Sequence, residues 1–383
     1  MRCPRCGNED PSWFWQGSRG WYCRRCIQFS RQLLEEEQTE SNLMAQRDEC
    51  DPELRLDYPL TPAQKRVSDQ LCEKIQTQDV LIYAVCGSGK TEIVMDCLRQ
   101  TLKKGQRAAV AIARRQVVLE LAQRFSAAFP HLVVTPVCQG YTAKTDGDLI
   151  VCTTHQLYRY IGAFDVLVLD EPDAFPFKGD PVLHGIAAAS CRGHTVYTTA
   201  TPDAHLQRRV RENTLTMLTL FSRPHGHPLP VPKIRVGPRW LLWLWLAAWL
   251  RKKEKEGKQA LIFVPTTAMS RRLARVFSVC YRVADISSRS VDKDEIIHRF
   301  RSGQTQFCFA TTILERGITI EGIDVAVLEA DHSVFDEASL VQMAGRIGRS
   351  FRCPDGEGLF LCRRRSAAAE NCIRSLRQAN AAG

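Results

Sequence analysis

The sequence predicts two α/β domains in tandem, each built on a parallel sheet, preceded by a small module that carries four paired cysteines. Three observations lead to this expectation. Short apolar runs alternate with helical patterns from residue 58 to residue 362, a proline-rich stretch interrupts the alternation, and two C-x-x-C pairs stand near the N-terminus. With 383 residues, the chain has room for two or three domains of about 150 residues each.

The first domain is expected over residues 58–222. Its apolar runs are short, continuous and rich in β-branched residues, which is what strands buried on both faces require. The six runs are VLIYAV, RAAVAIA, LVVTPV, DLIVC, FDVLVLD and TVYTT. Residues 1–31 hold the paired cysteines, and the acidic, polar residues 32–57 predict a linker helix between that module and the domain.

Residues 223–238 carry five prolines between Pro224 and Pro238. Because proline fixes φ and lacks an amide donor, this stretch is a poor helix or central strand, and we expect an inter-domain linker. The alternation then resumes in a second domain over residues 239–383. Its apolar runs are ALIFVP, RVADI, QFCFAT, DVAVLEA and GLFLC.

The most apolar stretch is WLLWLWLAAWL at residues 240–250. It is shorter than the roughly 20 residues needed to cross a bilayer, so no membrane span is predicted. It runs directly into RKKEKEGK. We expect a helix buried in the second domain, and a helix lying in a membrane interface is the alternative.

The cysteine usage predicts a reducing, cytoplasmic setting. There are 16 cysteines, but the N-terminal MRCPRCGNED lacks the apolar core of a signal peptide. Most of the cysteines stand singly within apolar runs, where they are small buried hydrophobes. The net charge of +10 favours polyanionic partners such as nucleic acid, although only weakly.

A glycine-containing turn, CGSGKT, follows the run VLIYAV and precedes a helical pattern. The strict phosphate-loop spacing G-x-x-x-x-G-K-[ST] would place glycine at position 84, where Ala84 stands. Backbone from Gly87 through Ser88 to Gly89 can still approach a phosphate closely. Lys90 would then reach the β- and γ-phosphates of a nucleotide, and Thr91 would ligate Mg²⁺. An ordinary glycine-rich turn is the alternative.

The second half of such a site would be acidic residues at the end of another strand. In FDVLVLDEPD, Asp170 would hold Mg²⁺ through water and Glu171 would orient and deprotonate the attacking water. A solvated acidic turn is the alternative. Upstream, Gln64 in YPLTPAQKRV could pair with the N6 and N7 edge of adenine, whereas Thr61-Pro62 could simply start a helix.

The second domain ends in SLVQMAGRIGRS, where Gln342, Arg346 and Arg349 are expected on one side of a helix. An arginine finger stabilises charge on a transferring phosphoryl group and contributes about 10³–10⁵ in rate. Supplied from a neighbouring domain, it would make ATP hydrolysis depend on domain closure. A basic face on a surface helix is the alternative.

The paired cysteines predict a zinc site. Cys3 and Cys6 are separated from Cys23 and Cys26 by 16 residues, within the range for a four-cysteine site in which two knuckles close a tetrahedron around the ion. Two redox pairs are the alternative. So short a module has no core of its own, so metal binding would supply much of its folding energy.

Three tryptophans lie between the cysteine pairs, among several arginines. Aromatic rings with interleaved arginines suit base stacking and phosphate contact, with stacking contributing about 1–3 kcal/mol per base. Shielding of the metal is the alternative, and docking to a protein partner is a third use. The tryptophans are Trp13, Trp15 and Trp21.

The order of these motifs resembles that of superfamily-two helicases over residues 58–362. The segments that carry the resemblance are CGSGKT, DEPD, TTATP, LIFVPT, TTILERGITIEGID and QMAGRIGR. Within that superfamily, DEPDAFPF, THQLYRY and TTILERG are most similar to the ComFA-type late competence ATPases, which also carry an N-terminal four-cysteine motif. The resemblance implies two RecA-like domains with ATP and Mg²⁺ at the cleft, and a zinc ribbon.

The resemblance also implies a role. By this resemblance, the chain would be a cytoplasmic, ATP-driven motor on single-stranded DNA that helps draw the incoming strand through a membrane channel during transformation. Its partners would be that channel and other competence proteins, and its place the inner face of the cell membrane. Two departures, DEPD for DEAD and Thr319 where DEAD-box RNA helicases usually have Asp, weaken an RNA-helicase interpretation.

By position, the resemblance assigns further residues. Thr199 and Thr201 would couple the ATP site to DNA, and Thr311 and Gly317 would lie at the interdomain cleft. Residues lining the strand path would be Arg114, Thr153 and Thr154. No inserted hairpin that would split a duplex is evident, so translocation is favoured over unwinding. The rival hypotheses are a replication-restart helicase, a scaffold that binds ATP without hydrolysing it, and a metal-sensing regulator.

Overall fold

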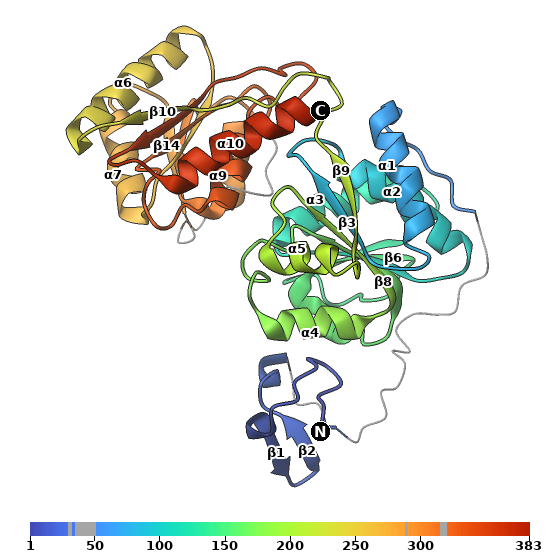
Figure 1. The fold of residues 1–383 in the computed structure, drawn as a ribbon. Coiled ribbons are helices and arrows are strands. Elements are labelled where there is room, and N and C mark those ends of the chain that lie inside the picture. Colours follow the sequence, from blue (N-terminus) through green and yellow to red (C-terminus); the bar gives the residue numbers. More distant parts are fainter. Residues whose placement is uncertain (30–32, 35–50, 288–289, 291, 315–319) are drawn as a thin grey trace. The chain divides into compact units, whose positions relative to one another are not determined.

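The computed structural model describes residues 1–383 except 30–32, 35–50, 288–289, 291 and 315–319. By its contacts the chain divides into two compact units, Met1–Ala84 with Gly89–Leu220, and Val85–Ser88 with Phe221–Gly383 (Figure 1). The helix expected over residues 32–57 lies largely outside the described residues, and residues 51–56 are not helical.

The first unit contains a seven-stranded sheet in which every neighbouring pair is parallel, in the order β5-β6-β4-β7-β8-β3-β9. All six predicted runs form strands, and β9 is a strand that the sequence patterns did not predict. Pro136 lies in β5 at the edge of the sheet, where a missing amide donor is tolerated. The strands are β3 (Val80–Ala84), β4 (Ala108–Ile112), β5 (Val134–Val137), β6 (Leu149–Thr153), β7 (Phe164–Asp170), β8 (Cys191–Thr199) and β9 (Thr216–Leu220).

Helices cover both faces of this sheet (Figure 1). One apolar cluster joins the sheet to α1 (Pro62–Lys74), α2 (Lys90–Lys103) and α3 (Arg115–Ala128). A second cluster joins the opposite side chains of the strands to α4 (Pro181–Ser190) and the 3-10 helix η3 (Thr154–Arg159). A short helix, α5 (Ala204–Arg211), packs through Leu206 against Leu81. Covering on both faces explains the continuous apolar strands.

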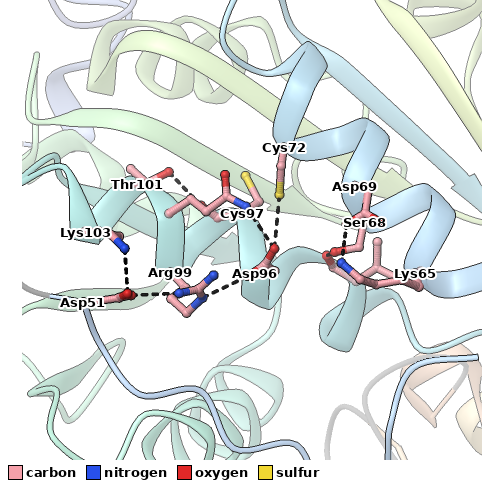
Figure 2. Close-up of polar contacts among 12 residues, drawn as sticks. Asp51, Lys65, Ser68, Asp69, Cys72, Asp96, Cys97, Arg99, Thr101 and Lys103 are labelled. Atoms are coloured by element: carbon pink, nitrogen blue, oxygen red, sulfur yellow. Dashed lines mark hydrogen bonds and ion pairs between the residues drawn. The ribbon is translucent and has the colours of Figure 1, made fainter.

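Polar contacts fix α2, the helix that follows the glycine-containing turn, against its neighbour α1 (Figure 2). The Ser68 hydroxyl of α1 donates to the Ile93 carbonyl at 2.9 Å, and the Cys72 thiol of α1 donates to Asp96 at 3.7 Å. Within α2, Arg99 Nε also donates to Asp96 at 2.9 Å. Asp51, which precedes α1, accepts from Arg99 at 2.8 Å and from Lys103 at 2.6 Å. These contacts hold the beginning and the last turn of α2 to separate parts of the unit.

The second unit contains a six-stranded parallel sheet in the order β10-β15-β14-β11-β13-β12. Five strands match the predicted runs. The sixth, β10, forms within the proline-rich stretch that was expected to be linker throughout, because an edge strand needs hydrogen bonds on one side only. The strands are β10 (Lys233–Val236), β11 (Ala260–Phe263), β12 (Val283–Ile286), β13 (Phe307–Ala310), β14 (Asp324–Leu328) and β15 (Gly358–Cys362).

One apolar cluster joins this sheet to α6 (Arg239–Lys255) and α7 (Thr267–Phe277). Another joins it to α8 (Lys293–Arg301), α9 (Glu337–Ala344) and α10 (Ala367–Ala382). The expectation that residues 240–250 form a wholly buried helix is wrong for one side of α6. Leu242, Leu246 and Leu250 are fully buried, but Trp240 is 66% and Leu244 58% exposed, because only one stripe of a surface helix reaches the core.

Within the described residues, none of the helices has both the length and the apolar character that crossing a membrane requires. The apolar run 240–250 ends in the basic last turn of α6.

The N-terminal module is a two-stranded antiparallel ribbon of β1 (Phe14–Gly17) and β2 (Gly20–Cys23), flanked by 3-10 turns η1 (Pro11–Trp13) and η2 (Ile27–Phe29). Its apolar side chains join the cluster that includes α4 and η3. The Phe29 ring lies 5.5 Å from that of Tyr158, and a Cβ added to Gly185 would sit 1.9 Å from the Cys6 carbonyl oxygen. Gly185 therefore permits close packing of the ribbon on α4.

Candidate nucleotide and metal sites

The predicted phosphate loop has the backbone that such a loop needs. Gly87 and Gly89 both have φ of +81°, a conformation that side chains with a Cβ rarely adopt, and α2 begins directly afterwards at Lys90. A Cβ on Gly89 would lie 2.3 Å from Gln64 Nε2. Ala84 is the last, fully buried residue of β3. Position 84 therefore has no need of glycine, and the beginning of α2 presents amides that attract anions.

Lys90, the predicted phosphate ligand, lies in the first turn of α2, and its ammonium donates to the carbonyl of Ala84 at 3.3 Å. This contact folds the side chain back over the loop that it follows. Thr91 is the next residue of the helix. The loop, the lysine and the threonine thus occupy the strand-to-helix junction that the motif requires.

Gln64 is buried, and it completes the N-terminal cap of α1. Its amide oxygen accepts from the Thr61 amide at 2.9 Å and from the Thr61 hydroxyl at 3.1 Å, in a reciprocal capping box. Its Nε2 lies beside Gly89. The two interpretations of this segment are therefore compatible: Thr61-Pro62 starts a helix, and the same glutamine reaches the nucleotide loop. Contact with adenine stays a prediction.

The predicted acidic pair lies at the end of β7. Asp170 is the last strand residue and accepts a hydrogen bond from the Thr198 hydroxyl at 2.5 Å. Glu171 follows with φ of +53°, although it is not glycine, and its amide donates to the Thr198 carbonyl at 2.8 Å. β7 and β3 both pair in parallel with β8. The acids and the phosphate loop therefore both follow the carboxyl ends of parallel strands, on the same side of the sheet.

Asp173 connects the acidic turn to the TTATP segment that follows β8. It is buried and accepts from the hydroxyls of Thr199 and Thr201, each at 2.6 Å. Two charge-assisted bonds to one carboxylate hold the two turns together. The sequence indicated coupling roles for both threonines, but it did not identify Asp173 as the residue that they share.

The residues assigned to a DNA path lie at ends of elements in the first unit. Thr153 ends β6, Thr154 begins η3, and Arg114 is the residue before α3. The Thr154 hydroxyl is buried and has no hydrogen-bond partner within the part of the chain that the structure describes. In the second unit Thr311 directly follows β13. Gly317 lies outside the described residues.

The predicted arginine helix is wrong in one respect. α9 ends at Ala344, so only Gln342 lies on it, while Arg346 and Arg349 lie in the turn that follows. Gly348 in this turn has φ of +63°, and a Cβ there would lie 2.1 Å from the Pro354 carbonyl oxygen. Glycine spacing predicts a break of this kind, but the helical spacing of the polar residues concealed it.

Gln342 and Arg349 differ in their surroundings. Gln342 is fully buried, and its Nε2 has no hydrogen-bond partner among the described residues. Arg349 is partly exposed, and its Nε donates to the Gly345 carbonyl at 2.7 Å. Arg346 is 2% exposed. The structure thus brings the three predicted residues onto one short segment.

Two residues of the proline-rich stretch also contact this turn, and sequence patterns gave no sign of them. Arg223 is 3% exposed and donates to the carbonyls of Ile347 at 2.8 Å, Gly348 at 2.7 Å and Gly345 at 3.3 Å. Burial lowers the pKa of Arg223 to about 10, so that the guanidinium stays charged at neutral pH. A ring nitrogen of His225 lies 3.1 Å from the Gly348 carbonyl.

The four paired cysteines converge as predicted. Their sulfur atoms all lie within 4.8 Å of one another, and all four residues are buried. The Cys3 and Cys26 sulfurs are 3.7 Å apart, and those of Cys6 and Cys23 are 3.8 Å apart. Four thiolates at about 2.3 Å from a tetrahedral Zn²⁺ would be separated by ~3.8 Å. The donor set therefore fits zinc.

The thiols of this cluster interact strongly. A hydrogen bond from Cys26 lowers the pKa of Cys3, while the hydrogen bond that Cys26 shares with Cys3 raises the pKa of Cys26. Ionisation of one thiol thus disfavours ionisation of its neighbour, and a bound cation would remove this repulsion between the thiolates. Trp13 and Trp15 are 43% and 55% exposed, so these two rings do not shield the cluster.

Comparisons with known proteins agree with this arrangement. Residues 57–204 match the family described as type III restriction enzyme, res subunit, and residues 242–351 match the helicase conserved C-terminal domain. The fold resembles that of S. cerevisiae Dbp5 bound to RNA and ADP BeF3, with a TM-score of 0.65 at 16% identity over 83% of this chain and 87% of that one. It also resembles RecG bound to a three-way DNA junction, with a TM-score of 0.61 at 17% identity over 85% and 47%.

Two parallel-sheet domains with these family matches define the class: the chain is a superfamily-two helicase ATPase with RecA-like domains. It is 34% identical to the competence protein ComFA of Bacillus subtilis, over 94% of this chain and 81% of that protein. It is 31% identical to ComFA of Streptococcus pneumoniae, over 99% and 90%. The chain belongs to the ComFA family.

Proposed function

We propose that the chain is a single-stranded-DNA-dependent ATPase that translocates along the strand and drives DNA uptake during competence. The observation that carries the ATPase part is that the phosphate loop and the acidic pair follow the carboxyl ends of parallel strands in one sheet. β3 delivers the phosphate loop, and β7 delivers Asp170 and Glu171. The names of the ComFA relatives support the competence part.

The residues of the phosphate loop, of α2 and of the end of β7 would have separate tasks at the nucleotide. Gly87 to Gly89 and the first amides of α2 would hold the phosphates, together with Lys90. Thr91 and Asp170 would hold Mg²⁺, which supplies charge neutralisation on the phosphates. Glu171 would orient and deprotonate the attacking water. Gln64 lies beside Gly89 and would reach the base.

The second unit would supply transition-state stabilisation. Arg346 and Arg349 stand on the turn after α9, and Gln342 Nε2, which has no hydrogen-bond partner in the described part of the chain, offers a further donor beside them. Charge develops on the phosphoryl oxygens during transfer, so donors held ready for that charge accelerate the step. Closure of the two domains on ATP would bring these donors to the phosphates and make hydrolysis a mechanical cycle.

DNA would reach the cycle through the Asp173 connection. Asp173 joins the acidic turn to Thr199 and Thr201, so a strand that shifts one turn would also shift the other. Arg114, Thr153 and Thr154 would contact the strand, and Thr311 would contribute from the second unit. The four-cysteine ribbon would bind Zn²⁺ and act as a docking element for DNA or for a protein of the uptake channel.

The test is ATP hydrolysis titrated with single-stranded DNA, duplex DNA and RNA of matched length. We expect stimulation by single-stranded DNA to exceed that by duplex or RNA by about tenfold or more, because only single strands expose unstacked bases. Equal stimulation by RNA would refute the DNA assignment. Hydrolysis that no nucleic acid changes would refute the motor, and absent hydrolysis with intact ATP binding would favour a scaffold.

A further inference from the structure

Arg223 is a buried arginine that donates to four carbonyls of the second unit, three of which lie in one turn and the fourth, that of Cys86, in the phosphate loop at 3.0 Å. It precedes β10 in the proline-rich stretch, and the three carbonyls of the turn that accept from its guanidinium are those of Gly345, Ile347 and Gly348. No carboxylate forms an ion pair with it among the described residues. A buried guanidinium of this kind is expensive unless its donors are satisfied in a fixed geometry.

The turn that receives these bonds is the one on which Arg346 and Arg349 stand. Since α9 ends at Ala344, the helix does not fix the direction of either arginine. The carbonyls of residues 345, 347 and 348 alternate with the two arginines, so bonds to them set the course of the backbone that carries both side chains. Arg349 itself bonds to the Gly345 carbonyl, which Arg223 also contacts.

His225 supports the same turn from two residues further along. Its ring nitrogen lies 3.1 Å from the Gly348 carbonyl, and its ring meets Phe351 edge-on at 6.1 Å. The ring of His227, two residues beyond, contacts Asp355 at 3.2 Å on the surface, and its backbone amide donates to His225 Nδ1 at 3.1 Å. Arg223 and His225 therefore contact the carbonyls of the turn directly. His227 is a nearby residue without such a contact among the described residues, and its substitution serves as a control.

We propose that Arg223, assisted by His225, is a positioning residue that sets the direction of the arginine finger at Arg349 by holding the carbonyls of the turn. This inference rests on the proposed function, in which Arg349 stabilises the transferring phosphoryl group. Arg223 belongs to the segment that joins the two domains. A change in the backbone of that segment would therefore also change the position of Arg349.

The test compares Arg223→Lys, Arg223→Met, Arg349→Lys and the surface control His227→Ala. Lysine keeps the charge but cannot bond three carbonyls in one plane. We expect Arg223→Lys to lower kcat for ATP by about 10²-fold, as misplacement of a catalytic group by an ångström does. The KM for ATP and the affinity for ADP are expected to stay within about twofold, since the finger acts in the transition state.

A second readout separates positioning from mere stability. The affinity for ADP with aluminium fluoride, which imitates the transferring phosphoryl group, should fall in Arg223→Lys and more strongly in Arg223→Met, while His227→Ala should match the wild type. Turnover of Arg223→Lys within about twofold of wild type would overturn the inference. So would a parallel loss of ADP binding, melting temperature and kcat, because that pattern indicates a structural role.

The Arg349→Lys variant distinguishes this inference from the proposed function. If Arg349→Lys is inactive while Arg223→Lys is fully active, only the positioning role fails. If Arg349→Lys hydrolyses ATP at the wild-type rate, the finger assignment within the proposed function fails, whatever Arg223 does. If both variants lose kcat and the affinity for the transition-state analogue together, both proposals stand.

Discussion

At the scale of single residues, Glu171 stands out because it occupies a conformation that its side chain disfavours. Its φ of +53° costs an L-residue about 1–2 kcal/mol relative to the ordinary helical region. Such strain persists where the surroundings determine it, and it is found at functional sites. The strain is consistent with a carboxylate aimed by the turn rather than by side-chain freedom.

We expect Glu171→Gln to abolish ATP hydrolysis, because the amide cannot accept a proton, while ATP binding is kept. Glu171→Gly should also be inactive, yet its free energy of unfolding should be equal to or up to about 1 kcal/mol above that of the wild type, since glycine adopts positive φ without strain. The measurements are phosphate release, binding of a fluorescent ATP analogue and urea unfolding. Normal turnover in Glu171→Gln would refute its role as base.

Lys90 gives the complementary prediction. Lys90→Ala removes the charge beside the phosphate loop, so both hydrolysis and the affinity for ATP should fall, each by at least about tenfold. Lys65→Ala is a suitable control, because Lys65 lies on α1 and is 59% exposed in its pair with Asp69. A Lys90→Ala variant that binds ATP as tightly as Lys65→Ala would contradict the assignment of this loop.

At the scale of elements, the connection between the ends of β7 and β8 is the feature on which coupling depends. The buried carboxylate of Asp173 serves both Thr199 and Thr201. An asparagine has a single acceptor oxygen in its amide. The substitution therefore replaces the acceptor of one threonine hydroxyl by an NH₂ donor, while it preserves the shape of the site.

We expect Asp173→Asn to lower the ratio of DNA-stimulated to unstimulated ATP hydrolysis by about tenfold or more, and the free energy of unfolding by ~2 kcal/mol, the range for a charge-assisted hydrogen bond. Asp203→Asn is the matched control, because Asp203 caps α5 and asparagine caps equally well. An Asp173→Asn variant with the wild-type stimulation ratio would show that the two turns are not coupled through this carboxylate.

At the scale of the whole molecule, we expect the ribbon to depend on a bound metal ion, whereas the two larger domains have cores of their own. The ribbon contributes few apolar residues to the cluster that it shares with α4 and η3. The apparent free energy of binding a structural Zn²⁺, about 10–16 kcal/mol in small zinc modules, would therefore be most of what keeps it folded. We expect the RecA-like domains to stay folded without that ion, because their apolar clusters lie in their own sheets and helices.

We expect metal analysis to find one zinc per chain in the wild type and none in Cys23→Ser with Cys26→Ser. Removal of zinc by a strong chelator, without nucleotide or Mg²⁺ present, should change the fluorescence of the ribbon tryptophans and leave the main thermal transition in place. A variant that lacks only Cys191 is the control, since that thiol lies outside the cluster. Wild-type protein that holds no more zinc than the double variant would refute the site.

Several features could be predicted from the sequence because they are local. The buried strands follow from continuous apolar runs, the phosphate loop from glycine at positions 87 and 89, and the cysteine cluster from its spacing. The end of α9 was missed because polar spacing was given more weight than Gly345 and Gly348. The strand β10 was missed because its partner β15 lies more than a hundred residues away.

By itself the sequence determined the class of fold, the order of the motifs and the chemistry available at each, since these depend on residue type and short spacing. Only the tertiary structure decided which side chains work together: Asp173 with Thr199 and Thr201, Gln64 with Gly89, and Arg223 with the turn that carries Arg349. The physical reason is that hydrogen-bond geometry between distant segments arises only when the sheets assemble, and no local pattern encodes it.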